Sequence, residues 1–541
     1  MGRSLLYPSQ WLLTIFILKR RILCVVSRFC LAIQYYFGIF AAGFAIMTKI
    51  SLQIGDVYAL QERETGKWFA FQIVQIGEEN AVYIDLDYWS EKIPEESHLK
   101  KMSYLRLNHH LWNNKTNQCW APIKFFPSHA KRVGNMVIRP IEECKSYGNW
   151  PNGSQQKWTE KWEKLPKDQV KAFKKAHTKW NETTIVAGKE VKKNLYELFD
   201  DILGAVSDFS EFEKLPGLGR VNTTKDYPQL IPFLERRYLI RELIWDHCHR
   251  RELDLSRTHL EEVEISGEDV ESILLPSSVS NLTLRGKLSP NLRVHSPNDG
   301  YYMILRVELH DDFLPDVGLN RLTNLRLTGI QDFNLKGISL RYPGLMWLGL
   351  AGKPGYIHDV AEISNLCELE TLTMDDLFGF SADDFPRPEN LPELRNLWLE
   401  SVSAEAGKTI KKSYKGMIQD LQVLKLRSDE WLHENLNNPL RHWDGSEFVP
   451  KSKYTKSVAL WKETRHRMIE EASHAELDLS AVKRITIDYV DGFNKLDRRT
   501  SFIETEERED IFNAFEQILN ETGLSEFKEE LIQLIDDNRR W

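Results

Sequence analysis

The chain has 541 residues, of which 42% are hydrophobic and 28% charged, so its composition is that of a globular protein long enough for two to four domains. Its formal net charge is −8. Residues 47–541 alone carry a net charge of −13, because they contain 66 basic and 79 acidic residues. This acidic excess argues against a general nucleic-acid-binding surface, and we expect no nucleic acid among the partners.

Residues 1–46 differ from the rest of the chain because they contain five basic residues and no acidic one. A basic cluster at 19–28 precedes Phe29–Ile46, which runs for eighteen residues without a charge. Three interpretations stay open: a membrane span, a secretory signal, or an upstream segment that is not translated because synthesis begins at Met47. We expect a cytoplasmic protein, with a single-pass membrane protein anchored by Phe29–Ile46 as the alternative. A membrane is a partner only if residues 1–46 are translated and retained.

Residues 47–150 are expected to form a small domain made mainly of β-strands. Short runs of alternating apolar and polar residues, such as 57–60, 68–74 and 81–84, are separated by turns that contain glycine. Strands of this length with such turns predict a small antiparallel barrel or a curled sheet.

The opening of this domain resembles the immunity protein 26 family of bacterial toxin systems. The resemblance rests on the order Gly55-Asp56-Val57-Tyr58-Ala59, then Gly66-Lys67-Trp68-Phe69-Ala70-Phe71, then a strand that ends near Asp85. It spans residues 50–140. It implies an immunity-like domain that neutralises a cognate polymorphic toxin by binding it.

Residues 151–185 are predicted to be a lysine-rich linker helix. Between 157 and 193 the chain has eleven lysines against five acidic residues, with aromatic residues interleaved. Trp158, Trp162 and Leu165 have helical spacing and would pack on a neighbouring domain while the lysines face water. The alternative is a basic surface for nucleic acid or an acidic membrane.

A helical N-terminal cap is expected over residues 186–259. The sequence favours a helix at Glu190–Val206, and residues 232–245 are expected to cover the first of the repeats that follow. Without such a cap, the open end of a repeat array would expose its core.

Residues 260–427 repeat one short pattern: an aliphatic residue, two variable residues, an aliphatic residue, one variable residue and a third aliphatic residue. The central aliphatic residues are 19, 25, 18, 23, 24, 25 and 27 positions apart. A strand turns alternate side chains to opposite faces, so the last two aliphatic residues of each copy should point into a shared core. The eight copies are Leu260-Val263-Ile265, Val279-Leu282-Leu284, Ile304-Val307-Leu309, Leu322-Leu325-Leu327, Leu345-Leu348-Leu350, Leu369-Leu372-Met374, Leu394-Leu397-Leu399 and Leu421-Leu424-Leu426.

This pattern resembles the leucine-rich-repeat family, whose period is about 20–29 residues. The resemblance implies an α/β fold, a leucine-rich-repeat solenoid with a curved parallel sheet, preceded by the small mainly-β, barrel-like domain. The chain departs from the family three positions after the last aliphatic residue, where Asn or Cys is usual. Here that position holds Ile330, Lys353, Leu377 and Val402.

The end of the chain is expected to cap the repeats. Residues 428–456 are rich in Asn, Pro and Ser and predict a loop or insertion. Residues 457–541 predict a helical cap with one further repeat strand at Val482-Ile485-Ile487. Its helices are expected at Ser457–Ser473, near Glu507–Leu519 and near Ser525–Ile535.

No motif for catalysis or for a cofactor stands out. The six cysteines form no C-x-x-C pair, and neither His247-Cys248-His249 nor His109-His110 has further ligands at metal-binding spacing. The chain contains no Walker loop, no H-E-x-x-H, no G-x-S-x-G and no dinucleotide fingerprint. We therefore expect a protein that is not an enzyme, with no catalytic residues, metal or cofactor.

The outward row of the predicted sheet is the candidate binding face. Two tryptophans on a solvent-facing row are costly to leave exposed, and Trp and Arg often anchor protein interfaces. The alternative is that Trp347 and Trp398 pack on each other or beneath the 428–456 segment. The predicted binding residues are Trp347, Trp398, Arg306, Glu308, Arg326, Asp375, Glu400 and Arg427.

These features favour a protein–protein interaction protein, a bacterial immunity protein or adaptor that binds a toxin through its repeats and its β domain. One alternative is an effector whose repeats select a protein substrate for an unrecognised enzymatic site. A weaker one is a membrane-anchored sensor that uses residues 1–46.

Overall fold

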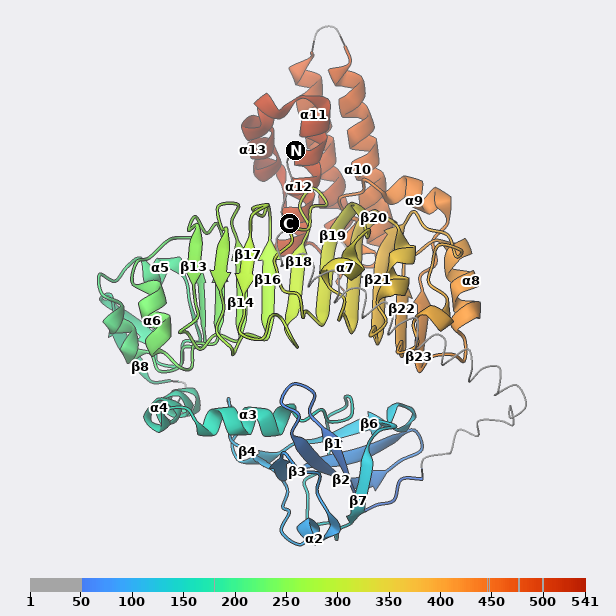
Figure 1. Cartoon of the computed structure of the whole chain (residues 1–541). Coiled ribbons are helices and arrows are strands. Elements are labelled where there is room, and N and C mark those ends of the chain that lie inside the picture. Colours follow the sequence, from blue (N-terminus) through green and yellow to red (C-terminus); the bar gives the residue numbers. More distant parts are fainter. Residues whose placement is uncertain (1–50, 180, 445, 447, 475–476, 499–500) are drawn as a thin grey trace, which may run out of the picture.

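The computed structural model of the chain describes residues 51–541, apart from residues 180, 445, 447, 475–476 and 499–500 (Figure 1). It shows a mixed α/β protein with a small antiparallel sheet near its N-terminus, a parallel sheet of eleven strands, and a group of C-terminal helices. The predicted α/β class and large parallel sheet are confirmed. No helix within the described residues is long and apolar enough to cross a membrane, and the segment Phe29–Ile46 lies outside them.

The N-terminal sheet is open, so of the two predicted forms, a barrel or a curled sheet, the barrel is wrong. Its strands pair antiparallel in the order β6-β3-β2-β1-β7, and no strand among the described residues joins its two edges. One face is buried around Phe71 and Trp150 and the other around Val82 and Tyr104, so the sheet buries its apolar residues without closing on itself. Its elements are β1 (Asp56–Gln61), β2 (Trp68–Ile76), β3 (Asn80–Ser90), α2 (Glu96–Leu99), β4 (Arg106–Leu107), β5 (Lys115–Thr116), β6 (Gln118–Pro122), η1 (Ile123–Phe125) and β7 (Lys131–Asn135).

Two helices follow the small sheet, α3 (Ser154–Glu163) and α4 (Lys167–Thr178). Trp162 is buried in a cluster with Leu239, which lies shortly before a strand of the large sheet, and Trp158 and Leu165 pack against the same cluster. The predicted packing of this lysine-rich segment on a neighbouring part of the chain is therefore confirmed.

The eleven strands of the large sheet are all parallel and follow one another in chain order. They are β10 (Glu197–Leu198), β11 (Arg220–Thr223), β12 (Glu242–Trp245), β14 (Glu262–Ser266), β16 (Asn281–Arg285), β18 (Ile304–Glu308), β19 (Asn324–Asn334), β20 (Trp347–His358), β21 (Thr371–Phe378), β22 (Asn396–Glu400) and β23 (Asp420–Leu424). The first inward residues of the strands lie in register, 19 to 25 positions apart, from Leu198 to Leu421. Every second residue therefore enters one continuous core.

The sheet begins three strands earlier than the predicted repeats, which corrects the expected helical cap at 186–259. The predicted helix at Glu190–Val206 is wrong, because most of this segment belongs to a hairpin strand, to β10 and to a one-turn helix. Leu218-Val221-Thr223 and Ile240-Leu243-Trp245 share the repeat spacing, but Thr and Trp at the last position hide it. The other elements here are β8 (Thr183–Val186), β9 (Lys189–Lys192), α5 (Asp200–Leu203), η2 (Phe209–Lys214) and α6 (Leu230–Arg236).

Two of the predicted repeat copies have a shifted register. In β18 the inward residues are Leu305 and Val307, two positions before the predicted pair, and an even shift leaves the two faces unchanged. In β23, Leu421 pairs with Leu397, three positions before the predicted residue. Because an odd shift exchanges the faces, Leu424 points outward and is 49% exposed.

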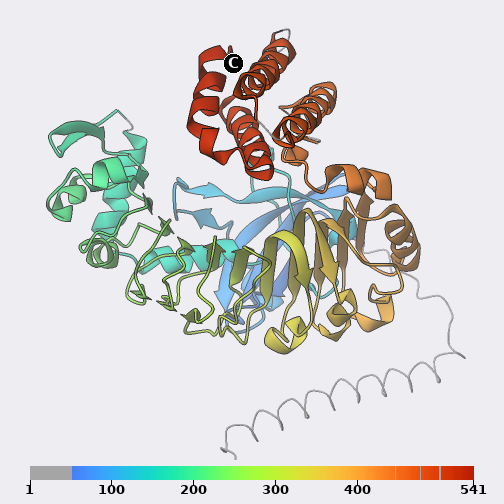
Figure 2. The ribbon, with the colours of Figure 1, turned by 90° about the horizontal axis from the view of Figure 1, so that it is seen from above.

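A second layer covers the other side of the core, and Figure 2 shows how the layered sheet bends into an arc. Over the first strands this layer is a short parallel sheet, and over the later strands it is helical. Its elements are β13 (Glu252–Asp254), β15 (Ser272–Leu274), β17 (Arg293–His295), α7 (Ile338–Arg341), η3 (Val360–Asn365), η4 (Pro388–Asn390) and α8 (Ala404–Tyr414).

The C-terminal part is helical, as predicted, but two details differ. Residues 428–456 are not a loop, because they contain helical turns with Leu440 and Trp443 buried. The predicted strand at Val482-Ile485-Ile487 lies within a helix, since a spacing of three residues also places side chains on one helical face. The elements are α9 (Asp429–Asn435), η5 (Arg441–Trp443), α10 (Lys451–Ala472), α11 (Leu479–Asp497), α12 (Thr505–Thr522), η6 (Ser525–Phe527) and α13 (Lys528–Asn538).

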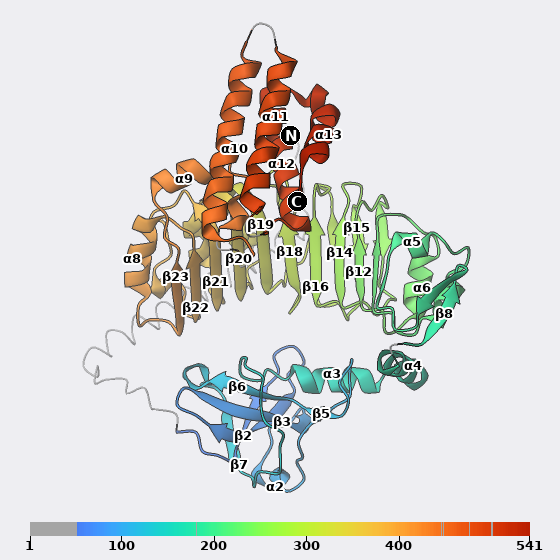
Figure 3. The same ribbon diagram turned by 180° about the vertical axis from the view of Figure 1, so that it is seen from behind.

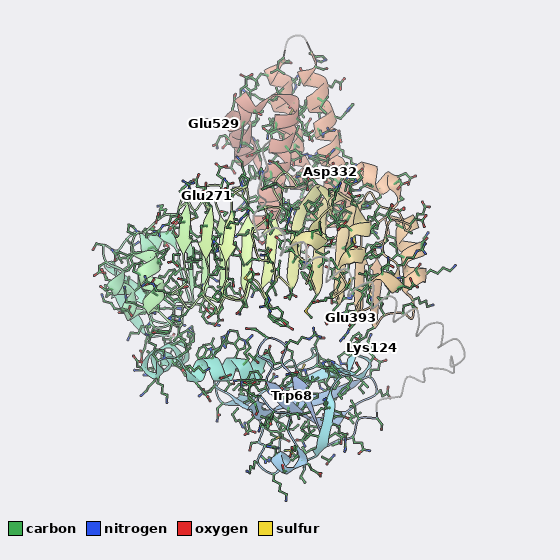
Figure 4. All side chains as sticks on the ribbon, in the orientation of Figure 1. Trp68, Lys124, Glu271, Asp332, Glu393 and Glu529 are labelled. Atoms are coloured by element: carbon green, nitrogen blue, oxygen red, sulfur yellow. The ribbon has the colours of Figure 1, made fainter. Side chains whose placement is uncertain are left out.

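The N-terminal part lies along the edge where the parallel strands begin, and the C-terminal helices rise from the edge where they end (Figures 1 and 3). Arg63 pairs at 2.8 Å with Glu370, the residue before β21. Gln419, the residue before β23, donates a hydrogen bond to the carbonyl oxygen of Lys124 at 3.5 Å. Figure 4 shows Lys124 beneath Glu393 at the same edge.

A buried ionic cluster joins the sheet to the C-terminal helices. The Arg441 guanidinium donates to Asp376 at the end of β21 at 2.6 Å and to Ser401 Oγ after β22 at 3.3 Å. Arg427 donates to the same Ser401 hydroxyl and to Asp444, both at 2.9 Å. Both guanidinium groups lie over the ring of Trp431, at 4.2 Å for Arg427 and 4.6 Å for Arg441.

Removing Arg441 should destabilise the protein strongly. Its side chain is 9% exposed and that of Asp376 is 17% exposed, so Arg441→Ala would leave a largely buried carboxylate without its partner, at a cost of about 3 kcal/mol. Arg467→Ala is the matched control, because its pair with Asp488 is exposed and worth less than about 1 kcal/mol. Calorimetric unfolding of the three proteins measures the difference. Equal midpoints for the two variants would contradict a structural role for the cluster.

Candidate protein-binding surface

The outer face of the parallel sheet is the face opposite its core, formed by the alternate, outward residues of each strand. Seven of the eight predicted binding residues lie on it. Arg306 and Glu308 are in β18, Arg326 in β19, Trp347 in β20, Asp375 in β21, and Trp398 and Glu400 in β22. The parallel register brings the outer residues of β20–β23 side by side.

Trp398 is the most prominent residue of the outer face. It lies in the middle of β22, yet its side chain is 43% exposed. The indole Nε1 donates to Asp420 at 2.8 Å, and Asp420 also accepts a hydrogen bond from Gln422 at 3.1 Å. These bonds hold the ring at one orientation. On the neighbouring strand Leu424 is 49% exposed, so two large apolar side chains on the outer face of β22 and β23 are open to solvent.

Trp347 has a different environment and is half-buried. A Cβ atom added to Gly349 would lie 2.6 Å from the Trp347 ring, so the indole covers that glycine on the same face. Strand β21 separates Trp347 from Trp398, and the part of the chain that the structure describes shows no ring contact between them. The alternative that the two tryptophans pack on each other is therefore wrong.

The charges on the outer face divide into two zones. In β18 and β19, Arg306 donates to Asn281 at 3.1 Å, Glu308 pairs with Lys353 at 3.5 Å, and Arg326 is exposed. The zone around Trp398 is acidic instead. Asp420 accepts the hydrogen bond of the Trp398 indole, and Asp375 and Glu400 lie on the same face.

Asp375 and Glu400 face each other across β21 and β22. Lys425 pairs with Glu400 at 2.8 Å, whereas Asp375 has no ion-pair partner among the described residues. The Asp375 side chain is exposed on the outer face. Desolvation by the surrounding protein, followed by the negative charges of Asp376 and Glu400, raises the pKa of Asp375 to about 6.

Arg427 does not belong to the outer face, which corrects its predicted placement there. It lies beyond the end of β23, its side chain is 14% exposed, and it forms part of the buried cluster around Trp431. The error follows from the shifted register of the last copy. The same shift hid Leu424, Gln422 and Asp420, which the spacing of about 24 residues between strands would have placed on the outer face.

The two histidine motifs have other environments. His109 Nδ1 and His110 Nδ1 are 2.7 Å apart, and His109 Nε2 is 3.0 Å from Gln155 Oε1. Burial lowers the pKa of His109 to about 4 and that of His110 to about 3, which favours the neutral rings. Near the other motif, Cys248 is buried. Among the described residues, no group of three or more His, Cys, Asp or Glu side chains could hold a metal ion.

Neither a protein-family model nor a curated protein sequence matches the chain.

Replacing the Asp375 carboxylate by an amide should stabilise the protein at neutral pH. Its pKa is about 6 in the folded protein against 3.8 normally, so ionising it opposes folding. This penalty is complete above pH 6, shrinks as the pH falls towards 3.8, and disappears below that. Asp375→Asn should therefore raise the unfolding midpoint more at pH 7.5 than at pH 5.

Thermal unfolding at the two pH values, with Asp383→Asn as the exposed control, tests this expectation. An increase in the unfolding midpoint that is equal at both pH values, or the same increase in the control, would contradict a raised pKa at Asp375.

Proposed function

We propose that this chain is a protein–protein interaction protein that binds a protein partner through the outer face of β20–β23. The observation that carries the proposal is the exposure of Trp398 and Leu424, at 43% and 49%, on neighbouring strands. Large apolar side chains on strands are usually shielded from solvent. An exposed Trp surrounded by polar groups is a common anchor of protein interfaces. The pre-set indole of Trp398 would bind with little loss of side-chain freedom.

The finer fold that we propose for the large sheet is a leucine-rich-repeat solenoid. The regular spacing of 19 to 25 residues, the parallel register and the second layer behind the core support it. In such an array each unit contacts only its neighbours, so the outer face stays available along its whole length.

For the partner we propose a bacterial toxin, and for the protein the role of immunity protein or adaptor. The support is the resemblance of residues 50–140 to immunity proteins. Asp56 of the resembling segment is 1% exposed and accepts hydrogen bonds from Arg132 at 2.7 Å and Asn135 at 3.2 Å. This motif therefore supports the pairing of β1 with β7, and toxin contacts would come from other residues of the domain.

We also propose that the protein acts by binding rather than by catalysis, in the cytoplasm, without a nucleic-acid partner. The acidic excess of residues 47–541 supports the last point. The acidic residues around Trp398 favour a partner whose contact surface is basic, because opposite charges speed association and fix orientation.

The experiment first asks whether a large toxin gene lies directly upstream of the gene for this chain, and then measures the binding of its product. Trp398→Ala should weaken binding by about thirtyfold, since a lost aromatic anchor costs on the order of 2 kcal/mol. Leu424→Ala should weaken it less. Thermal stability of Trp398→Ala should stay close to wild type, because the side chain lies outside the core.

Leu340→Ala is the matched control, because Leu340 is 67% exposed on α7, in the layer behind the core. Its binding should equal wild type. If Trp398→Ala loses stability but binds unchanged, the tryptophan has a structural role, and the partner binds at another surface. No binding of the toxin by the wild-type protein would overturn the immunity role itself.

A further inference from the structure

A surface cavity of about 590 Å³, open to solvent, lies between the start of α10 and the end of α11, away from the residues considered so far. Of the six described residues that line it, four are cationic. The lining consists of Ser452, Lys453, Lys456, Lys495, Leu496 and Arg498.

None of these four cations pairs with a carboxylate among the residues that the structure describes. Lys453 donates its ammonium to the carbonyl oxygen of Leu496, which places its charge against the cavity wall. Other cations of α10 are paired: Arg465 with Glu521 at 2.5 Å and Arg467 with Asp488 at 2.8 Å. In a chain with an excess of acidic residues, an unpaired group of four cations is unusual.

The start of α10 adds to this positive charge. The amino end of a helix carries partial positive charge, which favours acidic residues in the first turn. Helices α12 and α13 follow this rule, with Glu506, Glu507, Glu529 and Glu530 in their first turns. The first turn of α10 has no acidic residue, and it begins with Lys451. The two lining lysines of α10 therefore repel both each other and the helix end, unless an anion is present.

We propose that this cavity binds a small, multiply charged phosphate compound. Its volume of about 590 Å³ falls within the usual range of about 300–1,000 Å³ for small-ligand sites. The lining provides lysine ammonium groups, a serine hydroxyl and the planar guanidinium of Arg498, which together suit phosphate oxygens. Among the residues that the structure describes, no aromatic ring lines the cavity, so phosphate groups rather than a stacked base would supply the binding energy.

Binding of sodium tripolyphosphate to the full chain tests the proposal by isothermal titration calorimetry. We expect one saturable site whose affinity falls several-fold between about 50 and 300 mM salt, because the attraction is electrostatic. Lys456→Gln and Lys495→Gln should each weaken binding at least fivefold. Lys451→Gln and Lys483→Gln are the controls, since neither residue lines the cavity, and each should change the affinity less than twofold.

Three results would overturn the proposal. The first is the absence of saturable heat at millimolar tripolyphosphate, with circular dichroism confirming that the protein is folded. The second is an equal loss of affinity in the Lys451 and Lys456 variants, which would mean diffuse attraction to the helix end. The third is hexaglutamate binding as tightly as tripolyphosphate, which would assign the cavity to acidic peptides.

Discussion

The parallel register of the large sheet is the constraint on which the rest of this molecule depends. Each strand must set its inward residues beside those of the strand before it, or the core that runs from Val186 to Val423 would be interrupted. The same register determines which side chains are exposed to solvent, because the residues before and after each inward residue point to the outer face. The exposure of Trp398 and Leu424 is thus a result of how Leu397 and Leu421 are paired.

The two ends of the strands are used differently. Where the strands begin, contacts with the N-terminal part are made by half-exposed groups such as Arg63 and Glu370. Where they end, Arg441 and Arg427 lie largely buried over Trp431 and bind Asp376 in β21 and Ser401 after β22. Desolvated charges of this kind tolerate little displacement, because each would lose its partner in a low-dielectric setting. The C-terminal helices are therefore joined to the sheet through largely buried charges, and the N-terminal sheet is joined to it through more exposed ones.

The repeat pattern predicted the positions of the strands of the large sheet where the inward residues are aliphatic. They missed β11 and β12, whose inward residues include Thr223 and Trp245, and they misplaced β23, because Leu424 and Leu426 imitate its spacing. The outward row was predictable by alternation alone wherever the register was right, as for Trp347 and Trp398. Contacts between distant segments were not, since nothing in the local pattern links Arg441 to Asp376, sixty-five residues earlier. The cationic cavity has the same origin, in two helices whose lysines are far apart in sequence.

The open antiparallel sheet near the N-terminus has edges that a foreign strand could extend. At β7 this edge carries Lys131 and Arg132, both exposed. Charged side chains on an edge strand oppose the approach of another strand, because pairing would strip them of water. At β6, an isolated bridge between Trp120 and Tyr147 occupies part of the edge. The edges of the sheet are therefore unfavourable for the addition of a foreign strand, and replacing Lys131 by threonine would weaken this barrier at β7 while keeping Arg132, the partner of Asp56.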